Sequence, residues 1–473
     1  MALIHSFTFK DGEVSYRSKF LRSDTFKKNT HANRIVVSEF GTMVLPDPCQ
    51  TIFSKACSYL LAAIPDFTDN NLINIIRYGD EYYASSEINY MNQIDPTTLD
   101  VIEKINYRKH IALNLATAHP HYDEEGNTYN IGTALMRFGM PKYVIFKVPF
   151  NASEHKCKKP ALQNVEVVCN IPFRSTLFPS YYHSFGMTEN YIVFVEQPFK
   201  LDIPKLATAS FRGISWGSCL KYDKDDITLI HLVDKNTGKA VSTQFHTDAL
   251  VVFHHINAYE DDDHVVFDMI TYKDSNLYEM FYLENMRMQS NKFIESNVNF
   301  SRPVCQRFVL PLNVDTDTPK GTNLVRLKDT KAKAVMQKDG SLHCLPDTIF
   351  EGLELPGINY KINGKKYRYF YGSRVEWTPF PNKIGKVDIL TKQYKEWTEE
   401  GCYPSEPVFV ASPTAVEEDD GVILSSIVSL NPNKPNFMLV LNAKTFEEIA
   451  RASIDASIHL DLHGFFIPTQ TTT

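Results

Sequence analysis

Short segments rich in Val, Ile, Tyr and Phe recur from one end of the chain to the other, bounded by residues typical of tight turns. Such segments are typical of β-strands, and pairs such as Asp11-Gly12 and Asn363-Gly364 are typical of hairpin turns. The predicted strands are Ile35–Phe40, Tyr143–Val148, Val165–Ile171, Tyr191–Glu196, Ile227–Val233, Val251–Ile256, Val265–Tyr272, Phe308–Leu312, Val387–Leu390, Val422–Ser429 and Phe437–Leu441. Hairpins that follow one another predict an all-β fold, either a sandwich, a barrel or a propeller. The large number of strands favours the propeller, although no strict sequence repeat is visible.

Two segments have helical character. The first is Ile52–Ile64, and the second is Phe199–Phe211, a shorter mixed run interrupted at Pro204. In the first, apolar residues fall on one face at spacings of three and four. These residues are Phe53, Ala56, Leu60 and Ala63. No linker rich in Gly, Ser or Pro divides the chain, so we expect one domain over residues 1–473.

The composition argues against several classes of protein. The 473 residues are 43% hydrophobic and 22% charged, as in an ordinary globular protein with a sizeable core. A net charge of −7 provides no basic surface for nucleic acid. Eight cysteines stand singly without a CxxC pair, which predicts free thiols in a reducing cytosol. No signal-peptide pattern is visible and no stretch approaches the roughly 18 apolar residues that span a bilayer, so we expect a cytosolic protein that at most lies on a membrane.

Fifteen histidines are present, and composition alone does not separate metal ligands from structural residues. A single histidine beside a strand is more often a half-buried, hydrogen-bonded residue than a ligand. Several local settings place a histidine at the edge of an apolar run or beside a turn former. They are Ala118-His119-Pro120-His121, Tyr182-His183-Ser184-Phe185-Gly186, Phe253-His254-His255-Ile256 and Leu462-His463-Gly464-Phe465. Converging strands of a propeller would gather such distant side chains.

These histidine settings occur together with three further motifs, Pro46-Asp47-Pro48-Cys49, Pro404-Ser405-Glu406-Pro407 and Glu417-Glu418-Asp419-Asp420-Gly421. In order and spacing the chain resembles the animal carotenoid cleavage oxygenases from Ala2 to about Pro468. Segments such as Ile64–Asn70 and His459–Gly464 resemble the central-cleaving branch of that family. The resemblance implies a seven-bladed β-propeller with a helical and loop cap over an iron site. It also implies an enzyme that uses O2 to cleave the central 15,15′ double bond of β-carotene to two retinal molecules.

The resemblance implies four Fe(II) ligands, namely His119, His183, His254 and His463, with His121 and His255 as neighbours only. It further implies carboxylates that pair with three of the ligands: Glu87 with His183, Glu354 with His254 and Glu406 with His463. Imidazole suits Fe(II), and carboxylates that accept the remote ring N–H orient each ring and supply negative charge. Read alone, each glutamate would be a surface residue; the matched motifs favour the pairing.

A carotenoid has no donor atom for a metal, so an apolar tunnel must hold it by shape. Tyr181, Tyr272 and Tyr403 are the candidate tunnel residues, because Tyr181 lies two residues before His183, Tyr272 ends a predicted strand and Tyr403 is close to Glu406. Their ring faces could stabilise positive charge that develops on the polyene. Ordinary packing within the propeller is the alternative for each of them.

Carotenoids are insoluble in water, so we expect the tunnel to open onto a membrane. Candidates for the membrane patch come from the two helical segments: Phe53, Leu60, Leu201, Ile203, Leu206 and Phe211. Cys49 precedes the first segment, Cys57 lies in it, and both are candidate acylation sites. The alternative is that both segments pack onto the propeller as a cap.

Members of the family usually carry residues before the position that Met1 occupies, so we expect the N-terminal part of the ring closure to be missing and the chain to be less stable than an extended version. Two other functions stay open. One is a carotenoid- or retinoid-binding protein without turnover, and the other is eccentric cleavage or retinyl ester isomerohydrolysis on the same scaffold.

Overall fold

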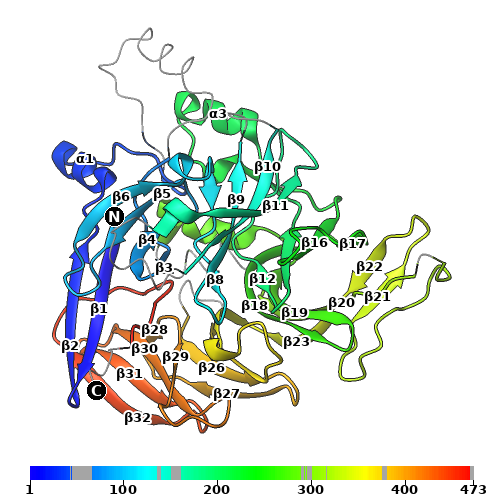
Figure 1. Ribbon diagram of the computed structural model, residues 1–473. Coiled ribbons are helices and arrows are strands. Elements are labelled where there is room, and N and C mark those ends of the chain that lie inside the picture. Colours follow the sequence, from blue (N-terminus) through cyan, green and yellow to red (C-terminus); the bar gives the residue numbers. More distant parts are fainter. Residues whose placement is uncertain are drawn as a thin grey trace. The chain divides into compact units, whose positions relative to one another are not determined.

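The computed structural model describes residues 1–42, 44, 67–135, 140–150, 161–288, 292, 295, 301–315, 317–374 and 381–468. Strands dominate this part of the chain (Figure 1). The first predicted helix, with Phe53, Leu60 and the candidate acylation sites Cys49 and Cys57, lies outside the described residues.

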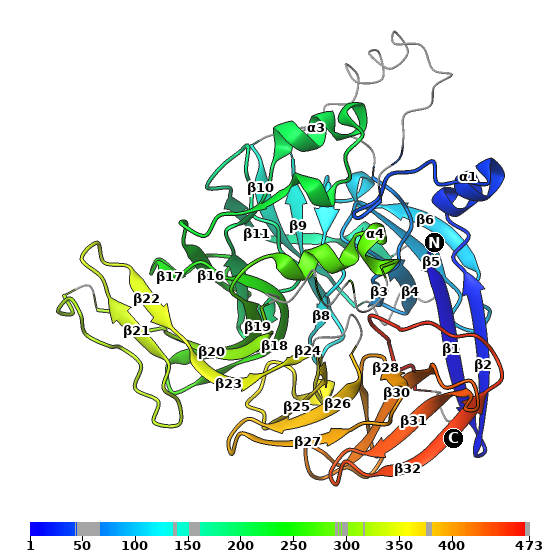
Figure 2. The ribbon, with the colours of Figure 1, turned by 180° about the vertical axis from the view of Figure 1, so that it is seen from behind.

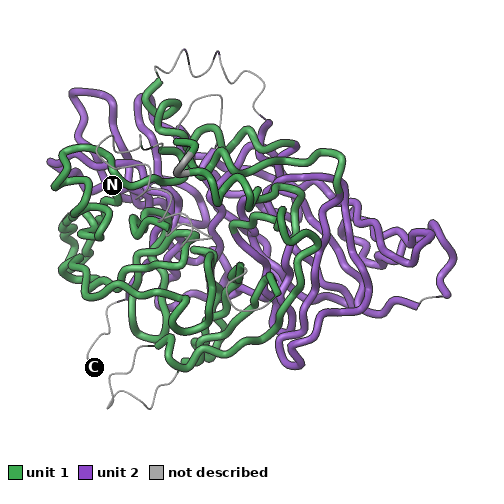
Figure 3. The backbone as a smooth tube through the Cα atoms, turned by 90° about the horizontal axis from the view of Figure 1, so that it is seen from above, with its two compact units in different colours: residues 1–183, 196–226, 274–289 green, residues 184–195, 227–273, 290–473 purple. Residues whose placement is uncertain are grey.

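The chain forms two compact units (Figure 3). Unit 1 contains residues 1–183, 196–226 and 274–289, and unit 2 contains residues 184–195, 227–273 and 290–473. The chain therefore passes repeatedly from one unit to the other, and neither unit is a continuous stretch of sequence.

The sheets of unit 1 are antiparallel. In the first of them, the Asp11-Gly12 turn between the two strands has positive φ at both residues, as a type I′ hairpin turn requires. In pairing order the sheets are β1 (Leu3–Lys10) with β2 (Glu13–Phe20); β3 (Asn74–Tyr78), β4 (Glu81–Ser85), β5 (Tyr90–Ile94) and β6 (Val101–Asn106); β11 (Glu166–Pro172), β10 (Lys142–Val148), β9 (Thr128–Ala134) and β7 (Leu115–Ala116), with β8 (His121–Tyr122) also on β9; and β14 (Phe199–Leu201) with β15 (Leu220–Tyr222).

In unit 2 most strand pairs are antiparallel, whereas β17 and β22 are parallel. The sheets are β12 (Gly186–Met187), β13 (Tyr191–Glu196), β16 (Thr228–Asp234), β17 (Phe245–Thr247), β22 (Leu342–Leu345) and β21 (Lys333–Met336); β18 (Val251–Asp261), β19 (His264–Tyr272), β20 (Val304–Pro311) and β23 (Asp347–Glu351); β24 (Leu353–Gly357), β25 (Tyr369–Arg374), β26 (Lys383–Asp388) and β27 (Gln393–Trp397); and β28 (Cys402–Pro404), β30 (Gly421–Ser429), β31 (Asn436–Asn442) and β32 (Glu448–Ile454), with β29 (Val408–Ala411) also on β30. The last two sheets are seen most clearly from behind (Figure 2).

Sheets such as β3–β6 and β24–β27 run up and down in sequence order, which is the arrangement of a β-propeller blade. Apolar clusters within each unit join the faces of two such sheets. In unit 1, Met91 of β5 belongs to one cluster with Phe146 of β10, and in unit 2 Phe245 of β17 belongs to one with Phe267 of β19. The fold is mainly β and of the propeller class.

Most predicted strands are confirmed, and the differences have local causes. The prediction Ile35–Phe40 is wrong, because the Val36 N–H donates to the side chain of Asn29 instead of to a neighbouring strand. Strand β26 ends at Asp388, before the predicted end, because the Asp388 carboxylate accepts the N–H groups of the turn that follows.

The helices differ more from the prediction. Phe199–Phe211 divides into strand β14 and helix α3 (Ile203–Arg212), where Pro204 is tolerated because it lies in the first turn. Helix α1 (Asp24–Ala32), capped by Ser23, was not predicted. The remaining described helices are short: α4 (Leu283–Met286), η1 (Tyr107–Lys109), η2 (Ala161–Asn164), η3 (Gly217–Cys219), η4 (Asn276–Phe281) and η5 (Tyr360–Ile362).

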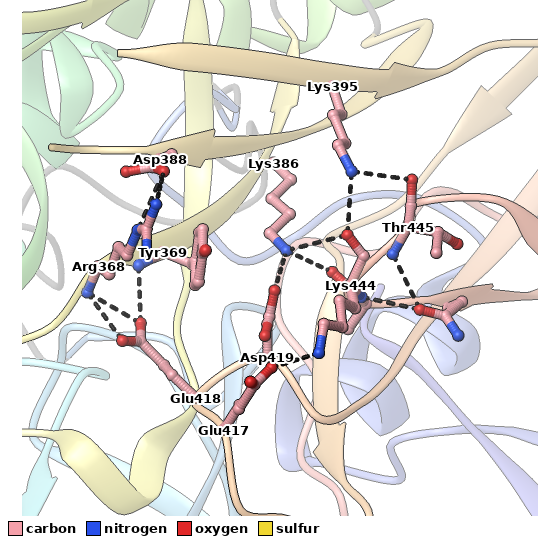
Figure 4. A network of polar contacts seen from close by, with 12 residues as sticks. Arg368, Tyr369, Lys386, Asp388, Lys395, Glu417, Glu418, Asp419, Lys444 and Thr445 are labelled. Atoms are coloured by element: carbon pink, nitrogen blue, oxygen red, sulfur yellow. Dashed lines mark hydrogen bonds and ion pairs between the residues drawn. The ribbon is translucent and has the colours of Figure 1, made fainter. Parts of the chain in front are cut away.

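The acidic run Glu417–Asp420 fastens a turn of unit 2 to β25 and β26 (Figure 4). The Glu418 carboxylate accepts the backbone N–H of Tyr369 at 2.7 Å. The ammonium of Lys386 on β26 lies 2.5 Å from Asp419, donates to the Ala443 carbonyl at 2.8 Å and faces the Tyr369 ring at 4.1 Å. Burial lowers the pKa of Lys386, and the two partners of this ion pair are each nearly inaccessible to solvent.

Replacing Lys386 by Met should leave the buried Asp419 charge without its partner. We expect a loss of about 3–5 kcal/mol in the free energy of unfolding, measured by chemical denaturation. Lys444→Met is the matched control, because Lys444 pairs with Glu417 on the surface, with 55% and 59% of the side chains exposed, and such pairs contribute at most about 1 kcal/mol. Equal losses in both variants would contradict the role of the buried pair.

Candidate metal centre

Two of the predicted ligands, His119 and His183, form a pair within unit 1. His119 follows β7 in a loop that is fixed by two hydrogen bonds: its N–H donates to Thr117 Oγ1 at 2.9 Å, and Asn74 Nδ2 donates to the Ala118 carbonyl at 2.7 Å. His183 is buried. The Nε2 atoms of the two rings lie 2.9 Å apart.

The other two predicted ligands form a pair within unit 2, with 3.3 Å between the Nε2 atoms of His254 and His463. His254 lies on β18 within an irregularity of the pairing with β19, between the paired residues Val252 and His255, and such bulges re-aim a side chain. His463 lies in an irregular segment that Asp461 attaches to the last sheet, through its N–H to Ser405 Oγ at 2.9 Å and its carboxylate to Ser426 Oγ at 2.5 Å.

Each pair has the geometry of two ligands of one ion. Imidazole nitrogens about 2.1 Å from a first-row metal and at right angles to each other are about 3 Å apart. The distances of 2.9 and 3.3 Å agree with adjacent positions around such a metal. Imidazole donors suit Fe(II), as they do zinc, copper and nickel.

Each of the three predicted carboxylates lies against a predicted partner. The Nδ1 atom of His183 lies 2.5 Å from Glu87, that of His254 lies 2.6 Å from Glu354, and that of His463 lies 2.8 Å from Glu406. A carboxylate on Nδ1 places the proton on that nitrogen, which leaves the Nε2 lone pair for a metal. It also fixes the ring orientation and supplies negative charge.

The backbone adds donors to these carboxylates. The Leu355 N–H donates to Glu354 at 2.6 Å, and the Gly464 N–H donates to Glu406 at 2.9 Å. Leu355 has a φ of 51°, which is a strained, left-handed backbone conformation for a leucine. Burial raises the pKa of Glu354, but the His254 imidazole and the hydrogen bonds from the Leu355 N–H and the Tyr272 hydroxyl outweigh it, so the pKa lies below its ordinary value. Neither backbone donor was predicted from the sequence, because side-chain motifs do not show where an N–H points.

The two neighbouring histidines have other surroundings. His121 begins β8, paired with Tyr129. His255 Nδ1 lies 2.9 Å from Ser184 Oγ, and its ring stacks over Phe267 at a centroid distance of 6.3 Å. His255 therefore contacts Ser184 and Phe267 of β19 within unit 2.

Two of the candidate tunnel tyrosines use their hydroxyl groups at the centre. Tyr181 donates to Glu87 at 2.6 Å, and burial raises its pKa well above the ordinary value. Tyr272 donates to Glu354 at 2.9 Å, while Tyr403 lies on β28 opposite Val428. A cavity of about 30 Å³ beside Glu87 and Tyr181 has room for about one water molecule and is too small for a polyene.

The structure corrects one residue of the predicted membrane patch. Leu206 is only 2% exposed, because it turns inward from α3 and packs against Phe67 and Cys219, so its assignment to a surface patch is wrong. Leu201 and Ile203 are partly buried, and Phe53, Leu60 and the side chain of Phe211 lie outside the described residues. Among the described helices, none combines the length and apolar character needed to cross a membrane.

The chain is similar to known proteins over nearly its whole length. The family model described as retinal pigment epithelial membrane protein (RPE65) matches residues 1–468. The chain is 57% identical to Beta,beta-carotene 15,15'-dioxygenase of Mus musculus over 469 residues, 99% of this chain and 82% of the mouse protein. The protein of that name from Gallus gallus is also 57% identical, over 99% of this chain and 88% of the chicken protein. The mitochondrial carotenoid-cleaving dioxygenase of Homo sapiens is 41% identical, over 99% of this chain and 82% of the human protein.

Solved structures share the fold. A point mutant of the Synechocystis apocarotenoid oxygenase gives a TM-score of 0.72 at 18% identity and covers 99% of this chain and 87% of that one. The cobalt-substituted form of the same oxygenase gives 0.70, with the same identity and coverage. With a family model and several relatives that match nearly its whole length, the chain belongs to the RPE65 family of carotenoid oxygenases.

Proposed function

We propose that this chain is an Fe(II)-dependent dioxygenase that cleaves the central 15,15′ double bond of β-carotene with O2 to give two molecules of retinal. The observation that carries the proposal is the difference in identity between two kinds of relative. Proteins named Beta,beta-carotene 15,15'-dioxygenase are 55–57% identical to it, whereas those named carotenoid-cleaving dioxygenase are 41–42% identical, over the same 99% of the chain.

The two histidine pairs, in this proposal, hold one iron ion together, so that His119, His183, His254 and His463 are its protein ligands. The separation of the Nε2 atoms within each pair supports this assignment. A bound iron ion would supply the chemistry by which O2 reacts with the substrate. The protein's part is to keep the ligand nitrogens unprotonated and correctly oriented, which the carboxylates of Glu87, Glu354 and Glu406 do through Nδ1 for three of the four ligands.

The polyene is held by shape in this proposal, because it offers no polar group to the protein. We place the whole of residues 1–473 in one seven-bladed propeller domain. The repeated passage of the chain between its two compact units supports a single domain, since neither unit is a separable stretch of sequence. Five described cysteines are buried free thiols, which supports a reducing, cytosolic location.

The reaction is tested by incubating the iron-loaded protein with β-carotene and, separately, with a retinyl ester, and separating the products by chromatography. Retinal as the only product, from β-carotene alone, is the expected result. Two apocarotenals of unequal length would show eccentric cleavage, and retinol released from the ester would show an isomerohydrolase. Carotenoid that stays bound and unchanged would show a binding protein without turnover.

Iron binding tests the ligand assignment. His119→Ala, His183→Ala, His254→Ala and His463→Ala should each lose the iron that wild-type protein retains at about one ion per chain, by elemental analysis. The Gln variants of Glu87, Glu354 and Glu406 should bind iron roughly 10–100-fold more weakly, because loss of such a hydrogen-bond partner typically has that effect.

His121→Ala and His255→Ala are the controls for the ligand variants and should keep the metal. Full iron content in all four ligand variants would rule out the proposed centre. Wild-type affinity in all three Gln variants would rule out the pairing of histidines with carboxylates while leaving the ligands in place.

We further propose peripheral membrane contact around the start of helix α3. Ile203 is hydrogen-bonded through its N–H to the carbonyl of Leu177, and Leu177 and Phe178 are 46% and 43% exposed, so apolar side chains gather there. Apolar side chains at a surface favour insertion into the outer layer of a bilayer.

Sedimentation with phosphatidylcholine vesicles tests this contact. Phe178→Asp should reduce the fraction of protein bound to vesicles, because a charge replaces an apolar side chain at the interface. Ile102→Asp is the control, since Ile102 on β6 is an equally apolar residue that is 60% exposed in the same unit. Equal vesicle binding by wild type and Phe178→Asp would place the contact elsewhere.

A further inference from the structure

The three carboxylates beside the predicted ligands divide their oxygen atoms in the same way. One oxygen of each lies against the Nδ1 of a histidine, and the other accepts a hydrogen bond from a second donor. The donor to the other oxygen is the Tyr181 hydroxyl for Glu87, the Tyr272 hydroxyl for Glu354 and the Gly464 N–H for Glu406. In Glu354 the oxygen that faces His254 also accepts the Leu355 N–H, so the Tyr272 hydroxyl is the donor to the remaining oxygen.

The second donor matters because a carboxylate with one partner is free to turn about its terminal bond, whose rotational preference is weak. A hydrogen bond to the other oxygen fixes the plane of the group and therefore the direction in which it accepts the Nδ1 proton. It also keeps a buried anionic oxygen from being left without a donor, a condition that proteins avoid.

Tyr181 is held by its surroundings so that its hydroxyl reaches Glu87. Its ring packs edge-on against Phe199 and Tyr278, each at a centroid distance of 5.6 Å. The hydroxyl oxygen lies 2.6 Å from Glu87 Oε2 and 3.3 Å from His183 Nδ1, whereas Nδ1 itself lies 2.5 Å from Glu87 Oε1. Hydroxyl, carboxylate and imidazole thus form one polar triangle in unit 1.

Tyr272 has the same relation to the second carboxylate, within unit 2. It ends β19, pairs with Val251 of β18 and is almost completely buried. Its hydroxyl lies 2.9 Å from Glu354 Oε1, while His254 Nδ1 lies 2.6 Å from Oε2. Two tyrosines, one in the irregular segment before β12 and one at the end of β19, therefore act on two carboxylates by the same contact.

We infer that Tyr181 and Tyr272 are positioning residues, whose hydroxyls hold Glu87 and Glu354 in the orientation that presents the Nε2 atoms of His183 and His254 to iron. The inference rests on the proposed iron centre. It differs from a role of the ring faces towards the substrate, because a phenylalanine keeps the ring and loses only the hydroxyl.

The test is the Fe(II) affinity of Tyr181→Phe and Tyr272→Phe, measured without O2 by titrating metal-free full-length protein against a chelating indicator. Each variant should bind iron about tenfold more weakly, the lower end of the range for loss of a group that orients a metal ligand. This measurement of Fe(II) affinity does not depend on turnover and needs no carotenoid.

Two matched variants control for the loss of any buried hydroxyl. Tyr182→Phe removes a hydroxyl that pairs with Thr133 at 2.9 Å, and Tyr367→Phe removes one that donates at 2.6 Å to the buried carboxylate of Asp268. Tyr367→Phe therefore loses the same kind of bond as Tyr272→Phe, at a carboxylate that orients no predicted ligand. Both controls should bind iron as the wild type does.

Wild-type affinity in Tyr181→Phe and Tyr272→Phe would overturn the inference, and so would equal losses in the two controls, which would indicate general loosening of the fold. These outcomes are distinct from failure of the iron centre itself. In that case the alanine variants of the four histidines would retain iron, whatever the tyrosine variants do.

Discussion

Antiparallel pairing between strands that are neighbours in sequence is the constraint on which the other features of this protein depend. Strand β19 shows this: its residues are buried throughout, and their backbone groups are satisfied by β18 on one side and β20 on the other. Because each sheet satisfies its own ladder, the irregular segments at strand ends can carry side chains without leaving buried polar groups unpaired. His119, after β7, and His463, after β32, lie in such segments.

The candidate centre shows how a protein selects which nitrogen of a neutral imidazole is available to a metal. An imidazole can bind a metal through either nitrogen, and the hydrogen bond at Nδ1 decides which one is available. In His254 and His463 that bond goes to a carboxylate, and in His183 the Nδ1 atom lies 2.5 Å from the carboxylate of Glu87, so the three Nε2 atoms are available in the same form. The negative charge of each carboxylate lies behind a histidine ring, on the side away from the metal position. There it balances the charge of a metal ion without occupying a coordination site.

The sequence allowed good prediction wherever a local pattern decides the structure. The strands β10, β13, β19, β30 and β31 coincide with the predicted segments to within a few residues, because their alternating or continuous apolar patterns have one stable conformation in a sheet. Predictions failed where a side chain competes for the backbone, as Asn29 does at Val36. They also failed at α3, where Leu206 was assigned to a surface although the apolar cluster of unit 1 buries it.

The sequence by itself determined the strand-rich fold, the family to which the motifs belong, and a short set of histidines and glutamates for the metal centre. Only the tertiary structure decided how those residues act. His254 and Glu354 are 100 positions apart, and Tyr272 reaches the same carboxylate from 82 positions away. Local sequence patterns extend over a few residues, whereas the direction of a lone pair depends on hydrogen bonds made by groups that only folding brings together, so the roles of the Tyr181 and Tyr272 hydroxyls were visible only in three dimensions.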